Sequence, residues 1–281
     1  MTVISTVITQ FCTAHASDSM VTRGKNEKDY HILDLKSTKI VCVRRWSGAM
    51  TYFGLAVCDD LKTGNRLWST LEWLRSQANN ATQFNAPEEF ARDLATKLDH
   101  KINSLPITDE KEKGIGIHFT AYEDVDGIPI PEFFHITNFA NVEYKQLLPE
   151  GVRVTRETYN NLTNDGDSPR SRHGEPEYRR EVRKRLSSGG MLIFNNGDTD
   201  MFNIASDAIR GIMNEAKKRN ILQPRNDPKA HRELAMWPIE LVAKVQKNFI
   251  KSGYQKVGGD LHNLSITPIG EYASETGDDR C

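Results

Sequence analysis

The hydrophobic pattern of this chain alternates between stretches typical of strands and stretches typical of paired helices. Short apolar and β-branched runs fill the first part, up to about Val57. Two helical patterns follow, then further strand patterns, two more helical patterns and a last strand. Two facing antiparallel sheets, each covered outside by a helix pair, satisfy this order because each pair buries its apolar stripe against one sheet. We therefore predict an α+β fold, a four-layer αββα sandwich.

Residue spacing and end signals locate the helices. Leu67, Leu71 and Leu74 recur at helical spacing in the first helix. Pro87 opens the second and Pro238 opens the last, since proline suits the first turn of a helix. The apolar faces of the later helices are Ala91, Ala95, Leu98 and Ile102; Phe202, Ala205, Ile209, Ile212, Met213 and Ala216; and Leu241, Val242, Val245 and Phe249.

The strands are predicted from alternation and from β-branched content. They cover residues 2–8, 12–18, 39–43, 115–121, 132–136, 191–194 and 261–266. A parallel doubly wound sheet would need strands and helices to alternate singly, and this chain does not show that order.

Composition fits one large globular domain or two small ones, and we predict a single domain over residues 1–281. The chain is 38% hydrophobic and has a formal net charge of −1. This balance gives no general attraction to nucleic acid or to acidic membranes. Residues 161–190 depart from the pattern: turn-forming residues precede a dense charge run, which we interpret as an insertion or mobile connection. A solvated helix with internal ion pairs is the simpler interpretation of that run, and a subunit contact or a patch for an anionic partner is the alternative.

The sequence suggests a cytoplasmic protein. Its four cysteines, Cys12, Cys42, Cys58 and Cys281, lack metal-like spacing and any extracellular framework pattern, so we expect free thiols in a reducing compartment. No apolar run is long enough to span a bilayer, and the N-terminus lacks the features of a signal peptide.

The strongest functional signal lies in the first forty residues. Thr2 follows Met1 directly, Asp18 ends the run Ala16-Ser17-Asp18, and Lys39 borders an apolar strand. A threonine in mid-chain is a poor nucleophile because nothing nearby takes its proton. At a processed N-terminus the free α-amine, with an ordinary pKa of about 8, supplies that base. Removal of Met1 would therefore make Thr2 a nucleophile with its own base.

This arrangement resembles the N-terminal-nucleophile (Ntn) hydrolases, and among them the proteasome β-subunit family with its bacterial relatives. The Thr2-to-Asp18 spacing matches that family without a gap, and Lys39 follows slightly late. The segment around Gly54 resembles the one whose glycine N–H binds the oxyanion. Gly258-Gly259, followed by an apolar strand, resembles the family's last Gly-Gly turn. The resemblance covers most of the chain at fold level and positions 2 to 56 at motif level.

The resemblance implies a role for each of these residues. Thr2 would be the nucleophile, Lys39 a fixed cation beside its hydroxyl, Asp18 the partner that orients Lys39, and Gly54 an oxyanion donor. The simpler interpretations are that Asp18 caps a turn, that Lys39 lies on a surface strand and that Gly54 marks a strand bend. Lys36 is the rival lysine.

Two departures from the family pattern concern supporting groups. The family places a serine on a glycine-rich turn before a central helix, where this chain has Asn195-Asn196-Gly197-Asp198-Thr199-Asp200. Asp198-Thr199-Asp200 is interpreted first as a helix cap, with support of the Thr2 amine as the alternative. The family also has an Asp and a Ser before the last Gly-Gly, where this chain has Tyr254 and Val257.

The resulting hypothesis is a threonine hydrolase that cleaves peptide or other amide bonds through an acyl-enzyme, without a cofactor or metal. His15, His118, His135 and His262 lack metal-ligand spacing. The resemblance implies a homo-oligomer, and an unfoldase partner stays open. The alternatives are a non-catalytic assembly or binding subunit of the same fold and an amidase for small molecules.

Overall fold

The computed structural model describes residues 3–9, 11–23, 31–60, 62–125, 127–142, 146–156, 191–197, 200–221, 227–250 and 257–274. The charged segment 161–190 lies outside these ranges, and so does Thr2. The interpretations of that segment therefore remain predictions.

Two five-stranded antiparallel sheets form the centre of the protein. The first has the strand order β14 (Leu192–Gly197), β1 (Val3–Ile8), β2 (Thr13–Asp18), β15 (Leu261–Ile266) and β16 (Tyr272–Ser274). The second has the order β13 (Arg153–Arg156), β10 (Ile128–Thr137), β9 (Ile115–Val125), β6 (Gly48–Gly54) and β5 (Ile40–Val43).

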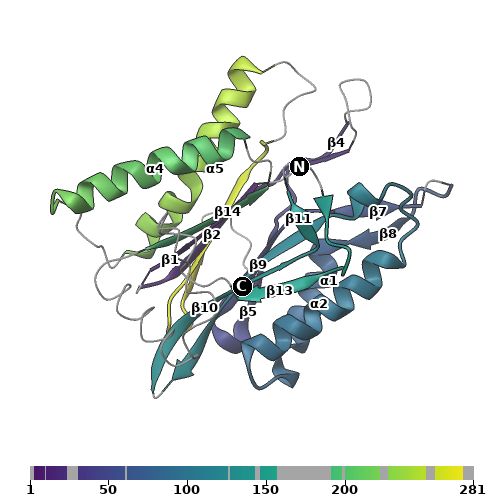
Figure 1. Ribbon diagram of the computed structural model, residues 1–281, viewed down its shortest axis with the longest axis horizontal. Coiled ribbons are helices and arrows are strands. Elements are labelled where there is room, and N and C mark those ends of the chain that lie inside the picture. The colour runs from purple at the N-terminus through teal and green to yellow at the C-terminus, as the bar shows by residue number, and fades with distance from the viewer. Residues whose placement is uncertain are drawn as a thin grey trace.

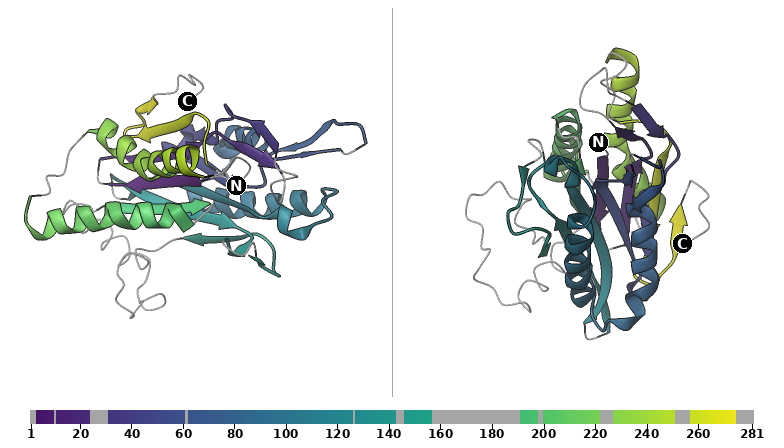
Figure 2. Two further views of the ribbon diagram at one scale, coloured as in Figure 1. Left: turned by 90° about the horizontal axis from the view of Figure 1, so that it is seen from above. Right: turned by 90° about the vertical axis from the view of Figure 1, so that its right-hand side faces the viewer.

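Smaller strand pairs lie at the margins of this centre. They are β3 (Val21–Arg23) with β4 (His31–Asp34), β7 (Val57–Asp59) with β8 (Arg66–Ser69), and β11 (Phe139–Asn141) with β12 (Gln146–Leu147). The β7–β8 hairpin extends beyond the sandwich (Figure 2). Short 3-10 helices cover η1 (Arg44–Trp46), η2 (Ala81–Gln83) and η3 (Glu110–Lys113).

Helices cover the outer face of each sheet. α1 (Thr70–Asn80) and α2 (Pro87–Asn103) pack on the second sheet, and α4 (Asp200–Lys218) and α5 (Pro228–Phe249) pack on the first (Figure 1). The described elements therefore form an α+β, four-layer αββα sandwich, which confirms the fold class predicted from the order of the patterns.

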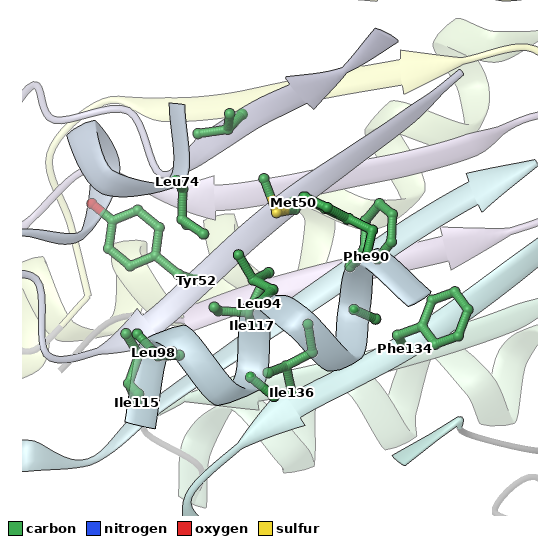
Figure 3. Close-up of a cluster of buried hydrophobic side chains, with 14 of the residues drawn as sticks. Met50, Tyr52, Leu74, Phe90, Leu94, Leu98, Ile115, Ile117, Phe134 and Ile136 are labelled. Carbon is green, nitrogen blue, oxygen red and sulfur yellow. The ribbon is translucent and has the colours of Figure 1, made fainter. Parts of the chain in front are cut away.

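The larger core lies between α2 and the outer face of the second sheet. Phe90, Leu94 and Leu98 of α2 point onto alternate residues of the strands, among them Met50 and Ile117 (Figure 3). These side chains are at most 1% exposed. Burying a large apolar side chain contributes about 1.5–3 kcal/mol, so this layer is the main apolar support of the second sheet.

The core under α4 and α5 joins both ends of the chain. Val3 and Val7 of β1 pack with Phe202 of α4 and with Leu234 and Ile239 of α5. β1 lies between β14 and β2 in its sheet, and the helices of the C-terminal part hold this N-terminal strand in place.

Two helix starts differ from the sequence prediction. Leu67 lies in strand β8, and α1 begins at Thr70, where the Ser69 hydroxyl accepts the Glu72 N–H at 3.4 Å. The last helix begins at Pro228 rather than at Pro238, because the Asp227 carboxylate caps it by accepting the Lys229 N–H at 2.9 Å. Pro238 lies inside α5, where its buried ring packs in the core.

Two observations bear on the predicted compartment. Cys12 and Cys58 are free, but Cys42 is disulfide-bonded, so the prediction of four free thiols is wrong for Cys42. Local spacing tests only for known motifs, whereas the fold decides which distant cysteines meet. No helix within the described ranges has both the length and the apolar character needed to cross a bilayer.

Two glycines at the start of β9 make room for a pair of aromatic rings between the sheets. Phe53 and Phe139 stack with their centroids 5.6 Å apart and their planes at 9°. A Cβ on Gly116 would lie 2.2 Å from the Phe53 ring, and one on Gly114 would lie 2.3 Å from the Phe139 ring. Gly114-Ile115-Gly116 is therefore a packing feature.

This packing predicts opposite effects for two glycine-to-alanine substitutions. Gly116→Ala should lower the free energy of unfolding by about 1–3 kcal/mol, because the Phe53 ring must move. Gly211→Ala is the control: its Cβ would meet nothing within 4 Å on the exposed face of α4. It should raise the free energy of unfolding by about 0.5–1 kcal/mol through better helix propensity. Urea unfolding of both variants measures this, and equal effects would contradict the packing account.

The layer between the sheets also buries histidines. His15 of β2 and His118 of β9 are 0% exposed. Burial lowers the pKa of His15 to about 3 and that of His118 well below its ordinary value, to which the neighbouring His135 and His15 add. Burial also lowers the pKa of His135 to about 4. These imidazoles are therefore neutral in the folded protein.

The buried histidines predict loss of stability in mild acid. Above about pH 6.5 both the folded and the unfolded chain hold them neutral, so stability is full. Below that pH only the unfolded chain takes up these protons. The free energy of unfolding should then fall by about 1.4 kcal/mol per pH unit for each of these histidines. Urea unfolding at intervals between pH 7 and 5 measures the slope, and a flat profile would contradict the prediction.

Candidate functional site

A fully buried ion pair joins the end of β2 to the start of β5. The Lys39 Nζ lies 3.0 Å from the Asp18 Oδ1, and both side chains are 0% exposed. Lys39 also donates to the Met20 carbonyl at 2.8 Å. Asp18 is therefore more than a turn cap, and Lys39 is not a surface residue.

The Asp18 carboxylate also binds the start of the chain and its last Gly-Gly turn. The Val3 N–H donates to Oδ1 at 3.2 Å, and the Gly258 N–H donates to Oδ2 at 3.3 Å. Oδ1 thus receives hydrogen bonds from both Val3 and Lys39, so these two groups are neighbours. Four sequence-distant segments meet at one carboxylate.

The Gly-Gly turn fits against the end of β2 because its second residue has no side chain. Gly259 has φ +75°, and a Cβ there would lie 2.3 Å from the Ser19 hydroxyl oxygen and 2.6 Å from the Leu35 carbonyl oxygen. The Ser19 N–H donates to the Asp260 carbonyl at 2.9 Å, and the Met20 N–H donates to the Gly258 carbonyl at 3.1 Å. These contacts fix Gly258 beside Asp18.

Burial and charge act on the pair in opposite directions. Burial raises the pKa of the Asp18 carboxyl, while the charge and hydrogen bond of Lys39 and the Gly258 N–H oppose the rise. Burial lowers the pKa of Lys39, opposed by the charge and hydrogen bond of Asp18. Mutual attraction in a water-free setting holds the two charges together.

Gly54 ends β6 in a conformation that only glycine adopts readily. Its φ is +89°, and a Cβ would lie 2.2 Å from the Gly114 carbonyl oxygen, which accepts the Leu55 N–H at 2.8 Å. Two residues earlier, the Tyr52 N–H donates to the Lys39 carbonyl at 3.3 Å. The bend accounts for the glycine, and the oxyanion role stays a prediction.

The supporting positions are only partly described. Asn195, Asn196 and Gly197 end β14, while Asp198 and Thr199 lie outside the described residues. Tyr254 also lies outside them. Val257 is buried in the core, and its N–H donates to the Gln246 side chain at 2.9 Å.

The structure adds three backbone groups that the sequence did not assign to the site, the Met20 carbonyl, the Gly258 N–H and the Val3 N–H. The Gly-Gly motif was a signal for the Gly258 N–H. The Met20 carbonyl has no sequence signal, because every residue has a carbonyl. Within the described residues no group of three or more His, Cys, Asp or Glu side chains is placed to hold a metal ion.

The fold and this site define an αββα sandwich with a buried lysine–aspartate pair that joins the end of β2 to the start of β5. Among solved structures, the Gly-1 mutant of Anbu from Hyphomicrobium sp. strain MC1 is similar, with 10% sequence identity and a TM-score of 0.48. The match covers 99% of this chain and 89% of that one. No family model matches the chain, and no curated protein matches it. So distant a similarity assigns no activity.

The buried pair predicts a large cost for removing one charge. Lys39→Met leaves Asp18 buried without its cation, so the free energy of unfolding should fall by about 3–5 kcal/mol. Lys97→Met is the matched control, because Lys97 pairs with Asp93 at 2.7 Å on the exposed face of α2. That change should cost less than about 1 kcal/mol. Urea unfolding separates the two, and similar losses would contradict the prediction.

Proposed function

We propose that this chain is an N-terminal threonine hydrolase of the Ntn type, which cleaves peptide or other amide bonds. The observation that carries the proposal is the buried Lys39–Asp18 pair beside the Val3 N–H. Thr2 is bonded to Val3 through that amide, and the proposal places its hydroxyl and α-amine beside the pair.

In the proposed mechanism the Thr2 hydroxyl attacks the substrate carbonyl, and the α-amine takes its proton. The carbonyl π electrons move to oxygen, and the tetrahedral intermediate collapses with loss of the protonated amine. Water then hydrolyses the acyl ester and restores the hydroxyl. The Gly54 N–H is the proposed oxyanion donor.

Lys39 has two tasks in this proposal. Its ammonium has three N–H donors, and among the described residues only Asp18 and Met20 accept from it. A further donor can therefore stabilise the developing negative charge on the Thr2 oxygen. The positive charge also disfavours a second cation nearby, which keeps the α-amine neutral and basic.

A non-catalytic subunit of the same fold is the second candidate, and Val257 favours it. The family that the sequence resembles has a supporting serine at this position, whereas Val257 is 3% exposed and apolar. In that case the pair would serve only to stabilise the fold.

The proposal extends to a homo-oligomer. In keeping with it, α4 exposes Ile204 and Ile212, and α5 exposes Trp237 and Leu241. Contiguous apolar patches of such side chains are typical of subunit contacts. A cytoplasmic location also remains part of the proposal.

Labelling with a β-lactone separates the two candidates. The cellular protein should lack Met1 and gain one adduct that maps to Thr2. Thr2→Ala should abolish the adduct because the nucleophile is gone, and Thr2→Ser should keep it. Thr96→Ala on the exposed face of α2 is the control and should label like the parent. Intact mass and peptide mapping measure this. Retention of Met1, or an adduct that survives in Thr2→Ala, would reject the enzyme and favour the non-catalytic subunit.

A further inference from the structure

Five polar side chains between the two sheets, four of them fully buried, form an unbroken hydrogen-bonded chain. Asn196 Nδ2 lies 2.7 Å from His118 Nε2, and His118 Nδ1 lies 3.0 Å from Thr6 Oγ1. Thr6 Oγ1 lies 3.2 Å from His15 Nδ1, and His15 Nε2 lies 2.7 Å from Thr120 Oγ1. The name "inter-sheet chain" denotes these five residues below.

The inter-sheet chain ties the sheets together more than once. Asn196, Thr6 and His15 belong to the first sheet, on β14, β1 and β2. His118 and Thr120 belong to β9 of the second. Except for Asn196, these residues are 0% exposed. A buried polar group without a partner is costly, so the loss of any one of these hydrogen bonds should destabilise both sheets.

Simple valence rules give the inter-sheet chain a direction. The Asn196 amide nitrogen can only donate, so His118 Nε2 accepts and His118 carries its hydrogen on Nδ1. His118 Nδ1–H then donates to the Thr6 oxygen. Among the described residues His15 Nδ1 is the remaining partner of the Thr6 hydroxyl, so this buried hydroxyl donates its one hydrogen there. His15 then carries its hydrogen on Nε2 and donates to Thr120. The two imidazoles are neutral and hold opposite tautomers.

One end of the inter-sheet chain lies beside the candidate N-terminal site. Asn196 pairs with Ile4 in the register of β14 and β1, and the next residue, Gly197, pairs with Val3. The Val3 N–H is the one that Asp18 accepts. Fixing the Asn196 side chain therefore fixes the end of β14 against the first residues of β1.

The centre of the inter-sheet chain supports a second side of the site. The His118 ring packs edge-on against Phe53 at 6.4 Å between centroids and against Phe133 at 5.0 Å. Phe53 directly precedes Gly54, the proposed oxyanion donor. His118 thus contacts both the strand that ends at Gly197 and the strand that ends at Gly54.

We propose that Asn196, His118 and Thr6 are positioning residues, which hold the ends of β14 and β6 against the start of β1 through one directed hydrogen-bonded chain. The effect of this positioning on catalysis rests on the proposed function. Its effect on the structure does not, because the group that it holds in place is the Val3 amide.

Thr6→Val tests the proposal because valine keeps the shape of threonine and removes the hydroxyl that links the two imidazoles. Thr6→Ser, which restores a hydroxyl, is the rescue. Thr51→Val is the matched control: Thr51 is also 0% exposed in this layer, and its hydroxyl has no hydrogen-bond partner among the described residues. Nitrogen NMR of the imidazoles reads the tautomers, and amide hydrogen exchange reads the Val3 N–H.

The parent and Thr51→Val should show His118 with hydrogen on Nδ1, His15 with hydrogen on Nε2 and a protected Val3 amide. Thr6→Val should lose the fixed tautomer pair and exchange the Val3 amide about ten times faster or more, and Thr6→Ser should recover both. The proposal would be overturned if His15 and His118 held the same tautomer in the parent. It would also be overturned if the Val3 amide exchanged at the same rate in Thr6→Val as in the parent.

The β-lactone reaction at Thr2 gives the catalytic readout. Its maximal labelling rate should fall by about 10- to 100-fold in Thr6→Val with little change in half-saturating concentration, since misplacement affects the reacting atoms more than binding. An unchanged labelling rate overturns the catalytic consequence. If the parent itself is not labelled, the proposed function fails, and the tautomers and Val3 exchange alone decide whether the inter-sheet chain positions the N-terminal strand.

Discussion

The arrangement of this molecule depends on one carboxylate that has no access to water. Asp18 accepts hydrogen bonds from the Lys39 ammonium and from the N–H groups of Val3 and Gly258. A buried charge is tolerated only when its lone pairs are satisfied, so each of these donors must stay in place. The start of β1, the end of β2, the start of β5 and the turn before β15 are thereby fixed relative to one another.

Most of the fold follows from residue patterns that act locally. The apolar stripes of α2 and α4 and the alternation in β9 reflect burial of one face, and they predicted both sheets and their helix pairs. Helix starts were harder to predict, because proline suits the first turn but is also tolerated in an interior, as at Pro238. The start of α5 is determined by Asp227, whose carboxylate caps the helix by accepting the Lys229 N–H. The sequence alone does not show this contact.

The candidate site was predicted unevenly. Asp18 and Lys39 were predicted because their spacing from Thr2 resembles that of the Ntn hydrolases, and the structure brings them together. The Met20 carbonyl was not found, since backbone groups leave no trace in a sequence. The inter-sheet chain was missed for another reason. His15 and His118 are 103 positions apart, and only the stacking of two sheets places Thr6 between them.

The Gly258 hydrogen bond to Asp18 makes the C-terminal strand part of the N-terminal site. If β15 detaches, the carboxylate loses one donor, and water gains access to the Lys39 charge. We therefore expect the start of β1 and the turn before β15 to open together, as a single cooperative unit. A binder or neighbouring subunit that loosened β15 would weaken the contacts of Val3 without touching it.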